Sequence, residues 1–449
     1  MYPNILFLTI DSLRSDKIYG NNKTSLTPNF DRLIKNGTYC SQAISTSDAT
    51  GLSIGSIITA MYPFKTGITQ HSYNSEIKTF FQIFEDNKYN VYATLPDSSF
   101  FLQMSKFFTD VDHYVYDKRE SWLQLSGGIG DQIIERLENK LSGPWLYYIH
   151  LMDLHAPFYV PKKFNSKKFG ETEYDQMVSL IDFWIGKFLE KINFENTIII
   201  ISSDHGDYIS SIKNWNEPLK VNSLLKTAKK FLPILEPIGE KIIFKYQNMK
   251  RKNKINKLKK NLSEKEIIKL IGRGQNHLYD DLVRIPLLFI GPGIPSNKII
   301  SSQVKQIDIF PTLVDHLDII LKNSFLDGIS LTPFFNNEHF VETPAYIESG
   351  SRNLKTEKNP SLYGNVIGIR TSKYKYWRSR GDSKKNVTLF NLENDPQEEN
   401  NISSNNPEII ISMEKIIINI KENSSINKNN FVIENNIDIE EELRKMGYM

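Results

Sequence analysis

Two apolar runs of the chain end in residues of the kind that bind metal ions. Residues 5–10 are nearly all apolar and run into Asp11, and residues 197–202 run toward Asp204 and His205. In an open parallel sheet, ligands bind beyond the carboxyl ends of the strands. Carboxylates together with an imidazole suit one divalent cation. Taken singly, the aspartate could instead be a helix N-cap and the Asp-His-Gly sequence a turn.

A third group with chemical potential lies in residues 46–63, a turn of small residues that leads into an apolar helix. Thr50 stands where that helix is expected to begin. A hydroxyl there faces the positive end of the helix, where anionic oxygens are favoured. Composition alone leaves open a simple capping role for Thr50 or Ser47.

The elements that must position these groups alternate between strand and helix. Short, nearly continuous apolar runs are typical of buried parallel strands. The alternation predicts an α/β domain with a mainly parallel sheet over residues 1–340, and residues 341–449 form a smaller C-terminal α+β subdomain and tail. The expected strands are 5–10, 89–94, 145–150, 197–202 and 287–290, with 366–370 and 375–377 in the subdomain; the expected helices are 28–37, 78–87, 128–141 and 175–192.

Segments in the right order along most of the chain resemble the sulfatase family of the alkaline phosphatase superfamily. They are NILFLTIDSLRSD (4–16), TPNFDRLIKNG (27–37), YYIHLMDLHAP (147–157), SDHG (203–206), LYDDLVRIPLLFIGPG (278–293), QIDIFPTL (306–313), DGISL (327–331) and TLFNLENDPQE (388–398). The resemblance implies an alkaline-phosphatase-like, doubly wound fold. It also implies that Asp11, Thr50, Asp204 and His205 are metal ligands.

The resemblance fails at one informative place. Sulfatases carry C/S-x-P-S-R, whose first residue becomes a formylglycine, whereas Thr50 is followed here by Gly-Leu-Ser-Ile, without the Pro or the Arg. No formylglycine is expected, and the single cysteine, Cys40, does not fit the motif and is expected to pack in a strand. A threonine at this position resembles the branch of phosphonate and phosphodiester hydrolases and phosphoethanolamine or phosphoglycerol transferases. There the threonine is both metal ligand and nucleophile.

The expected cofactor is one divalent metal ion, Mn, Mg, Zn or Ca. Ser12 stands where the family has a second aspartate, which disfavours a calcium site with many oxygen ligands. His155 and His277 are the candidates for protonating the leaving oxygen or holding the substrate anion. Arg370, Lys373 and Lys375 would border the cleft or be merely solvated.

Three functions remain open at this level. The first is a metal-dependent hydrolase or transferase that acts on phosphoester or phosphonate bonds through a covalent Thr50 intermediate. The second is a true sulfuric ester hydrolase, favoured by overall similarity and disfavoured by the missing motif. The third is a non-catalytic member that binds an anionic ligand, against which the retained ligand set argues.

The near-neutral charge of +3 hides one basic segment. Residues 211–270 carry 16 Lys or Arg and 5 Asp or Glu, a surplus of 11 positive charges, and they fall within a basic insertion at 211–273. We expect this insertion to lie on an anionic membrane surface, to cover the site as a lid, or to be a solvated helical excursion. No nucleic acid partner is expected, and without a signal peptide or transmembrane run the predicted location is cytoplasmic, peripheral to the membrane if the insertion binds it.

Overall fold

The structure is a computed structural model of the 449-residue chain. It describes residues 2–21, 23–70, 72–73, 76–115, 124–156, 158–209, 249, 253–272, 276–321, 326–350 and 363–422. The chain divides into two compact units, Met1–Asp207 with Asn276–Met449, and Tyr208–Gln275. The predicted basic insertion therefore lies mostly outside the described residues. Its described part contains α10 (Glu264–Ile271), which begins with a capping box between Ser263 and Glu266.

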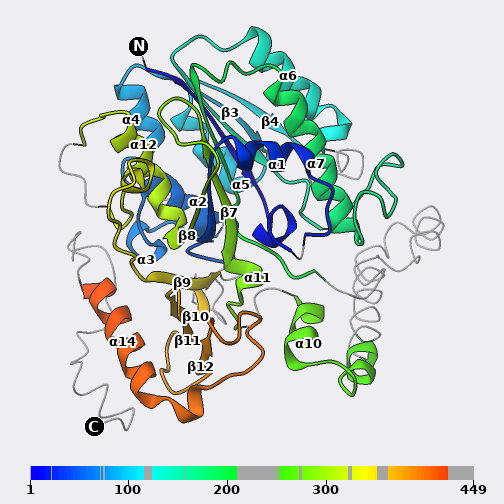
Figure 1. The fold of residues 1–449 in the computed structure, drawn as a ribbon, viewed down its shortest axis with the longest axis vertical. Helices are drawn as coiled ribbons and strands as arrows, with labels where there is room; N and C mark the ends of the chain where they lie inside the picture. The colour runs from blue at the N-terminus through cyan, green and yellow to red at the C-terminus, as the bar shows by residue number, and fades with distance from the viewer. Residues whose placement is uncertain are drawn as a thin grey trace, which may run out of the picture. The chain divides into compact units, whose positions relative to one another are not determined.

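An eight-stranded, mainly parallel sheet forms the core of the larger unit (Figure 1). Its order is β4-β3-β5-β1-β6-β7-β2-β8, and only β7 runs antiparallel to both of its neighbours. The strands are β1 (Asn4–Ile10), β2 (Thr38–Ile44), β3 (Asn90–Pro96), β4 (Asp110–Tyr114), β5 (Trp145–Leu151), β6 (Thr197–Ser202), β7 (Arg284–Ile290) and β8 (Lys298–Lys305). The predicted fold class is confirmed.

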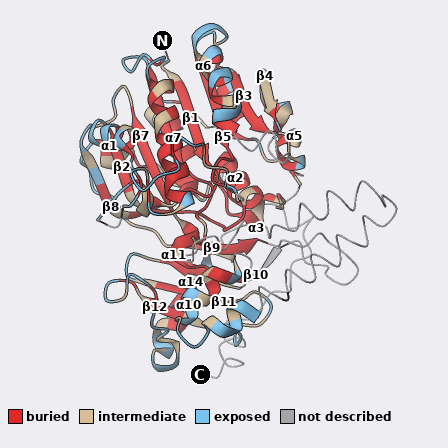
Figure 2. Ribbon diagram, turned by 90° about the vertical axis from the view of Figure 1, so that its right-hand side faces the viewer, coloured by how far each residue is buried: buried red, intermediate tan, exposed pale blue. Residues whose placement is uncertain are grey.

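Helices cover both faces of this sheet, which is why its central strands are buried throughout (Figures 1 and 2). On one face α2 (Thr50–Thr59), α4 (Phe80–Asp86) and α12 (Ile309–His316) share a core with alternate strand residues. On the other lie α1 (Pro28–Lys35), α6 (Ile129–Asn139) and α7 (Glu173–Leu189). The short helices are α3 (Pro63–Thr66), α5 (Ser99–Met104), α11 (Asp280–Val283) and α13 (Thr332–Phe335), with 3-10 helices at Ser15–Lys17, Ser105–Phe107, Gln124–Gly127, Gln306–Asp308 and Ser403–Asn405.

A four-stranded antiparallel sheet follows, in the order β12-β11-β10-β9. Its strands are β9 (Ala345–Gly350), β10 (Tyr363–Arg370), β11 (Tyr374–Ser379) and β12 (Thr388–Asn391). The helix α14 (Pro407–Glu422) packs on it through a core that includes Ile369, Tyr376 and Met413. This arrangement gives the predicted α+β character.

Three strands of the large sheet escaped the sequence analysis. β2 (TYCSQAI) mixes polar and apolar residues, β4 (DVDHY) is a polar edge strand, and β8 (KIISSQVK) is the opposite edge strand. Edge strands keep one side solvated, so they lack the continuous apolar run that marks the central strands. None of the helices in the described ranges has the length and apolar character needed to span a bilayer.

Candidate metal and nucleophile site

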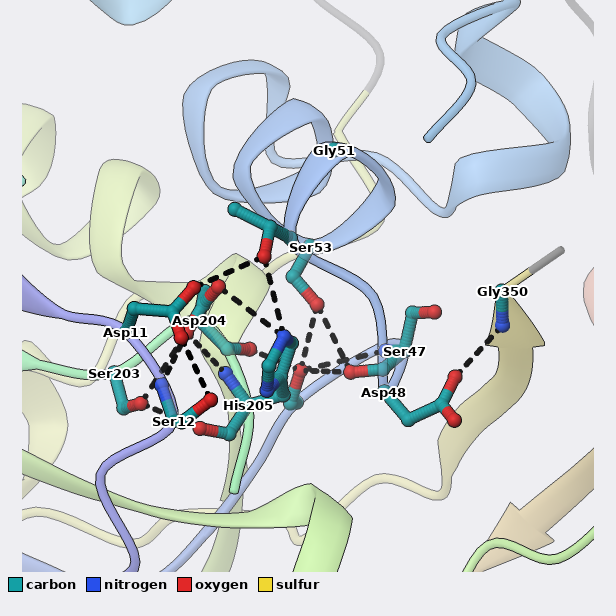
Figure 3. Close-up of polar contacts among 12 residues, drawn as sticks. Asp11, Ser12, Ser47, Asp48, Gly51, Ser53, Ser203, Asp204, His205 and Gly350 are labelled. Atoms are coloured by element: carbon teal, nitrogen blue, oxygen red, sulfur yellow. Dashed lines mark hydrogen bonds and ion pairs between the residues drawn. The ribbon is translucent and has the colours of Figure 1, made fainter. Parts of the chain in front are cut away.

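The two predicted metal-binding segments meet at one edge of the sheet because β1 and β6 are parallel neighbours in register. Thr9 pairs with Ser202, so Asp11 leaves the sheet beside Asp204 and His205. One ligand atom from each of these three residues lies within 4.8 Å of the others, and all three side chains are buried (Figure 3). The structure thus brings together the ligand set expected from the sequence.

Thr50 completes the cluster as the first residue of α2. Its hydroxyl oxygen, Oγ1, lies 3.1 Å from Oδ2 of Asp11 and 3.2 Å from Nε2 of His205. Thr50 is half-buried, whereas its two partners are buried. Its position in the first turn also directs the positive end of a ten-residue helix toward the site.

The turn before Thr50 is held in place from both sides. The Ser53 hydroxyl donates to the Ser47 carbonyl at 2.9 Å, and the Gly350 amide donates to Asp48 at 2.7 Å (Figure 3). Gly350 is the last residue of β9, so the C-terminal sheet anchors the turn that presents the hydroxyl. A Cβ at Gly350 would lie 2.1 Å from that of Ala49, and this close approach accounts for the glycine.

The tautomer of His205 follows from its second nitrogen. Nδ1 lies 2.8 Å from the carbonyl oxygen of Gly206, which can only accept, so Nδ1 carries the proton. Nε2 therefore presents its lone pair to Thr50 and the carboxylates. This is the form in which an imidazole can bind a metal ion.

The partners of Asp204 show how its buried carboxylate is held. Oδ1 of Asp204 accepts from the amides of Ser12 at 3.1 Å and His205 at 2.8 Å, while Oδ2 is buried and 3.4 Å from Nε2 of His205. Burial and the neighbouring Asp11 raise the pKa of Asp204 well above its usual value. Within the described ranges Asp204 pairs with no lysine or arginine. Two adjacent carboxylates and a neutral imidazole fit a divalent cation.

Ser12 contributes a hydrogen bond where the family has a carboxylate. Its hydroxyl donates to Oδ1 of Asp11 at 2.6 Å, and its backbone φ of +62° turns its amide toward Asp204. A φ in this left-handed region is uncommon for serine and costs conformational energy. The strained residue, Ser12, directly follows Asp11, the candidate ligand at the end of β1.

The two candidate acids lie on segments that border the cluster. His155 is exposed on the loop after β5, the other parallel neighbour of β1. His277 is half-buried and stacks on Tyr279, with 5.8 Å between ring centres. Its segment leads into α11, where the Leu282 carbonyl accepts from the Gly206 amide at 2.7 Å. The geometry leaves the roles of both histidines as predictions.

The interpretation of Arg370 and Lys375 as residues of the cleft border or of solvent was wrong. Both are buried and form ion pairs with Asp280, at 2.9 Å and 2.8 Å. Lys373, in contrast, is exposed and lies 3.7 Å from Glu393. No local pattern distinguishes the two lysines, because Lys373 precedes β11 and the burial of Lys375 depends on its contacts with Asp280 and Glu398, which are distant in the sequence.

A contact that the sequence did not reveal involves Gln70. Its side-chain oxygen accepts from the amide of Gly51 at 3.2 Å, directly after the candidate nucleophile. A Cβ on Gly51 would come within 2.6 Å of the carbonyl oxygens of Thr69 and Gln70. The glycine after Thr50 is thus required by the close approach of another chain segment, a requirement that no local pattern records.

Comparison with known protein families agrees with this architecture. Residues 3–319 match the Sulfatase family, and residues 274–423 match the family of the C-terminal part of N-sulphoglucosamine sulphohydrolase. Human arylsulfatase K is 33% identical over 144 residues, 31% of this chain and 26% of that protein. Bovine N-acetylglucosamine-6-sulfatase is 25% identical over 164 residues, 31% of this chain and 29% of that protein. The matches thus span about a quarter of the length of these relatives.

Two solved structures have folds similar to that of this chain. Ps i-CgsB in complex with k-i-k-neocarrahexaose has a TM-score of 0.65 at 19% identity, covering 95% of this chain and 94% of that one. The phosphonate monoester hydrolase of Agrobacterium radiobacter has a TM-score of 0.68 at 14% identity, covering 94% and 96%. At such low identity these likenesses establish the fold alone.

Proposed function

Because the chain belongs to the sulfatase family, we propose that it is a metal-dependent hydrolase or transferase that cleaves phosphoester or phosphonate bonds through a covalent ester of Thr50. One observation carries the proposal. The Thr50 hydroxyl lies at a helix N-terminus, 3.1 Å from Asp11 and 3.2 Å from His205. A free threonine hydroxyl is a poor nucleophile, and this environment is of the kind that activates one.

The cofactor would be a single Mn, Mg, Zn or Ca ion held by Asp11, Asp204, His205 and Thr50. Such a cation, when bound, polarises substrate oxygens and lowers the cost of deprotonating a hydroxyl. The protein's own contribution is a preformed, buried set of donors. The buried, adjacent carboxyl groups of Asp11 and Asp204 support this proposal, because a bound cation would favour their ionised forms.

The proposed reaction has two displacements at one phosphorus atom. The proton of Thr50 passes to Oδ2 of Asp11, because Nδ1 of His205 already carries a proton and the lone pair of its Nε2 would bind the cation. The hydroxyl oxygen attacks phosphorus. The bond from phosphorus to the leaving oxygen then breaks, and His155 or His277 protonates that oxygen. Water or an acceptor alcohol next gives a proton to the same histidine and attacks phosphorus. The bond from phosphorus to Oγ1 of Thr50 then breaks, and Thr50 regains its proton from Asp11. Hydrolysis and transfer differ only in this second acceptor.

A preference for phosphorus over sulfur is supported by what surrounds Thr50. Ile54, at the place of the family's arginine, is buried in the hydrophobic core, so no guanidinium from that position assists the nucleophile. A sulfuric ester hydrolase remains the second candidate, favoured by the similarity to arylsulfatase K.

The experiment supplies the protein with each cation in turn and offers 4-nitrophenyl sulfate, bis(4-nitrophenyl) phosphate and a phenylphosphonate monoester. Turnover of the phosphorus esters, with a phosphoryl or phosphonyl adduct on the Thr50 peptide by mass spectrometry, is the expected result. Thr50→Ala should lose both, and Thr50→Ser should keep the adduct. Turnover of sulfate alone would contradict the proposal in favour of the second candidate. No turnover with any cation would favour a binding protein.

A further inference from the structure

A group of lysines lies along the segment that follows His155. Residues 158–170 contain Lys162, Lys163, Lys167 and Lys168 and no acidic residue. All four lysines are exposed. Together with the half-buried Lys187 of α7 they form what we call the lysine surface.

Aromatic rings beneath the lysine surface hold several of its ammonium groups. Lys163 Nζ lies 4.2 Å from the ring centre of Phe183, and Lys187 Nζ lies 4.3 Å from that of Trp184. Such contacts are favourable without neutralising the positive charge. In the part of the chain that the structure describes, none of the five lysines forms an ion pair with a carboxylate. The surface therefore presents uncompensated positive charge.

The lysine surface is connected to the candidate site through α7. The ring of Phe158 packs edge-on against Tyr174, whose hydroxyl donates to the Ser12 carbonyl at 2.6 Å, next to Asp11. Further along, Phe164 packs against Phe183 of the same helix. Tyr174 and Phe183 are nine residues apart on α7, which corresponds to about 14 Å of helix. A ligand that reached from Thr50 to these lysines would have to be longer than one small ester.

We propose that the lysine surface binds the repeated sulfate or phosphate groups of a polymeric anionic substrate, one ester of which is processed at Thr50. The inference deepens the proposed function and rests on it. Exposed, unpaired lysines attract a polyanion and release its counterions. The substrate class is thus a flexible polyanion, with charges at several positions along its chain.

The contacts favour a soluble polyanion over a lipid bilayer or a nucleic acid. Membrane binding by a surface segment normally adds apolar side chains that enter the bilayer. Here Phe164 and Trp184 are buried beneath the surface, and Phe169 and Phe183 are only partly exposed. Rings covered by lysine ammonium groups are also poorly placed to stack on nucleic acid bases.

The test compares the full-length protein with a variant that carries Lys→Gln at 162, 163, 167 and 168. A matched control carries Lys→Gln at Lys35, Lys140, Lys384 and Lys385, which are exposed elsewhere. Fluorescent dextran sulfate and inorganic polyphosphate are the probes, and uncharged dextran is the blank. We expect the surface variant to bind at least about tenfold more weakly with a shallower salt dependence, and the control much less so. The dextran sulfate and polyphosphate arms distinguish sulfate from phosphate recognition.

Amide hydrogen exchange locates the binding independently of other basic segments. Exchange in residues 158–170 should slow with dextran sulfate or polyphosphate and stay unchanged with dextran. Equal binding by the surface variant and the control would overturn the inference, as would binding only to phosphatidylserine vesicles or only to an oligonucleotide. Turnover of a small aryl ester should be the same in both variants. If the wild type turns over no ester but the binding difference remains, the proposed function fails and the surface stands as a polyanion site alone.

Discussion

Two largely buried groups of acidic residues in this protein have opposite electrostatic character. In the first, Asp280 and Glu398 are each 2.8 Å from Nζ of Lys375, and Arg370 also pairs with Asp280. Although burial raises it, the cations of Arg370 and Lys375 hold the pKa of Asp280 well below its usual range. The carboxylates of this first group are therefore paired within the protein.

In the second group, Asp11 and Asp204 lie side by side with His205, and burial together with Asp11 raises the pKa of Asp204. This difference in pairing indicates different roles for the two groups. The paired group fastens the segment before β7 to the C-terminal sheet, a structural role. In the second group Asp204 pairs with no lysine or arginine among the described residues, and its position beside Asp11 and His205 suits an external cation.

The largest expected effect comes from breaking the second group. In Asp204→Asn the amide oxygen can still accept from Ser12 and His205, while the charge that holds the cation is lost. We expect turnover to fall at least about 1000-fold, equivalent to about 4 kcal/mol in the activation barrier. The thermal midpoint of the metal-free protein should rise, because a buried charge is removed.

Steady-state kinetics and calorimetry on metal-free and metal-loaded protein measure both effects. Asp131→Asn on the exposed face of α6 is the control and should change neither quantity. A metal-free Asp204→Asn protein that melts well below the wild type would contradict the claim of unbalanced charge.

Breaking the first group should damage the fold. Lys375→Met leaves the buried Glu398 and the partly buried Asp280 without their shared cation, and loss of one partner from a buried ion pair costs about 3–5 kcal/mol. Urea denaturation measures the free energy of unfolding. Lys373→Met removes an exposed pair two residues away and should cost less than about 1 kcal/mol. Equal losses of unfolding free energy in the two variants would show that burial of an ion pair does not determine its contribution to stability.

Asp153 sharpens the comparison, because it is a buried carboxyl outside both groups. Its Oδ1 accepts from the Leu125 amide at 3.3 Å, and burial raises its pKa to about 7. The folded-state pKa of Asp153 is above its unfolded value near 4. The protonated carboxyl therefore contributes its full stabilisation of the fold below pH 4, and this contribution is lost as pH rises through 7.

The free energy of unfolding of Asp153→Asn, relative to that of the wild type, should therefore increase by about 2–3 kcal/mol between pH 5 and pH 8. Urea denaturation at the two pH values gives the comparison. A pH-independent difference between the proteins would show that Asp153 keeps an ordinary pKa.

The two groups also show which parts of the structure could be predicted from the sequence. Asp11, Asp204 and His205 follow apolar strands, so the rule for parallel sheets was enough to bring them together. The anchoring of Asp48 by Gly350, the approach of Gln70 to Gly51 and the burial of Lys375 depend on packing between distant segments. Local patterns carry no such information, because a lysine in a short strand has the same sequence signal whether its face is covered or solvated.

The smallest effect is the response to a cation, and it tests the comparison most directly. A cation at ten times its dissociation constant should stabilise the wild type by about 1.4 kcal/mol, since only the folded protein assembles the site. The shift should persist in Lys375→Met, whose paired group lies outside the ligand set, and vanish in Asp204→Asn. Thermal denaturation against metal concentration measures it. If Asp204→Asn shifted as much as the wild type, the cation would be binding elsewhere and the charge around Asp204 would need another explanation.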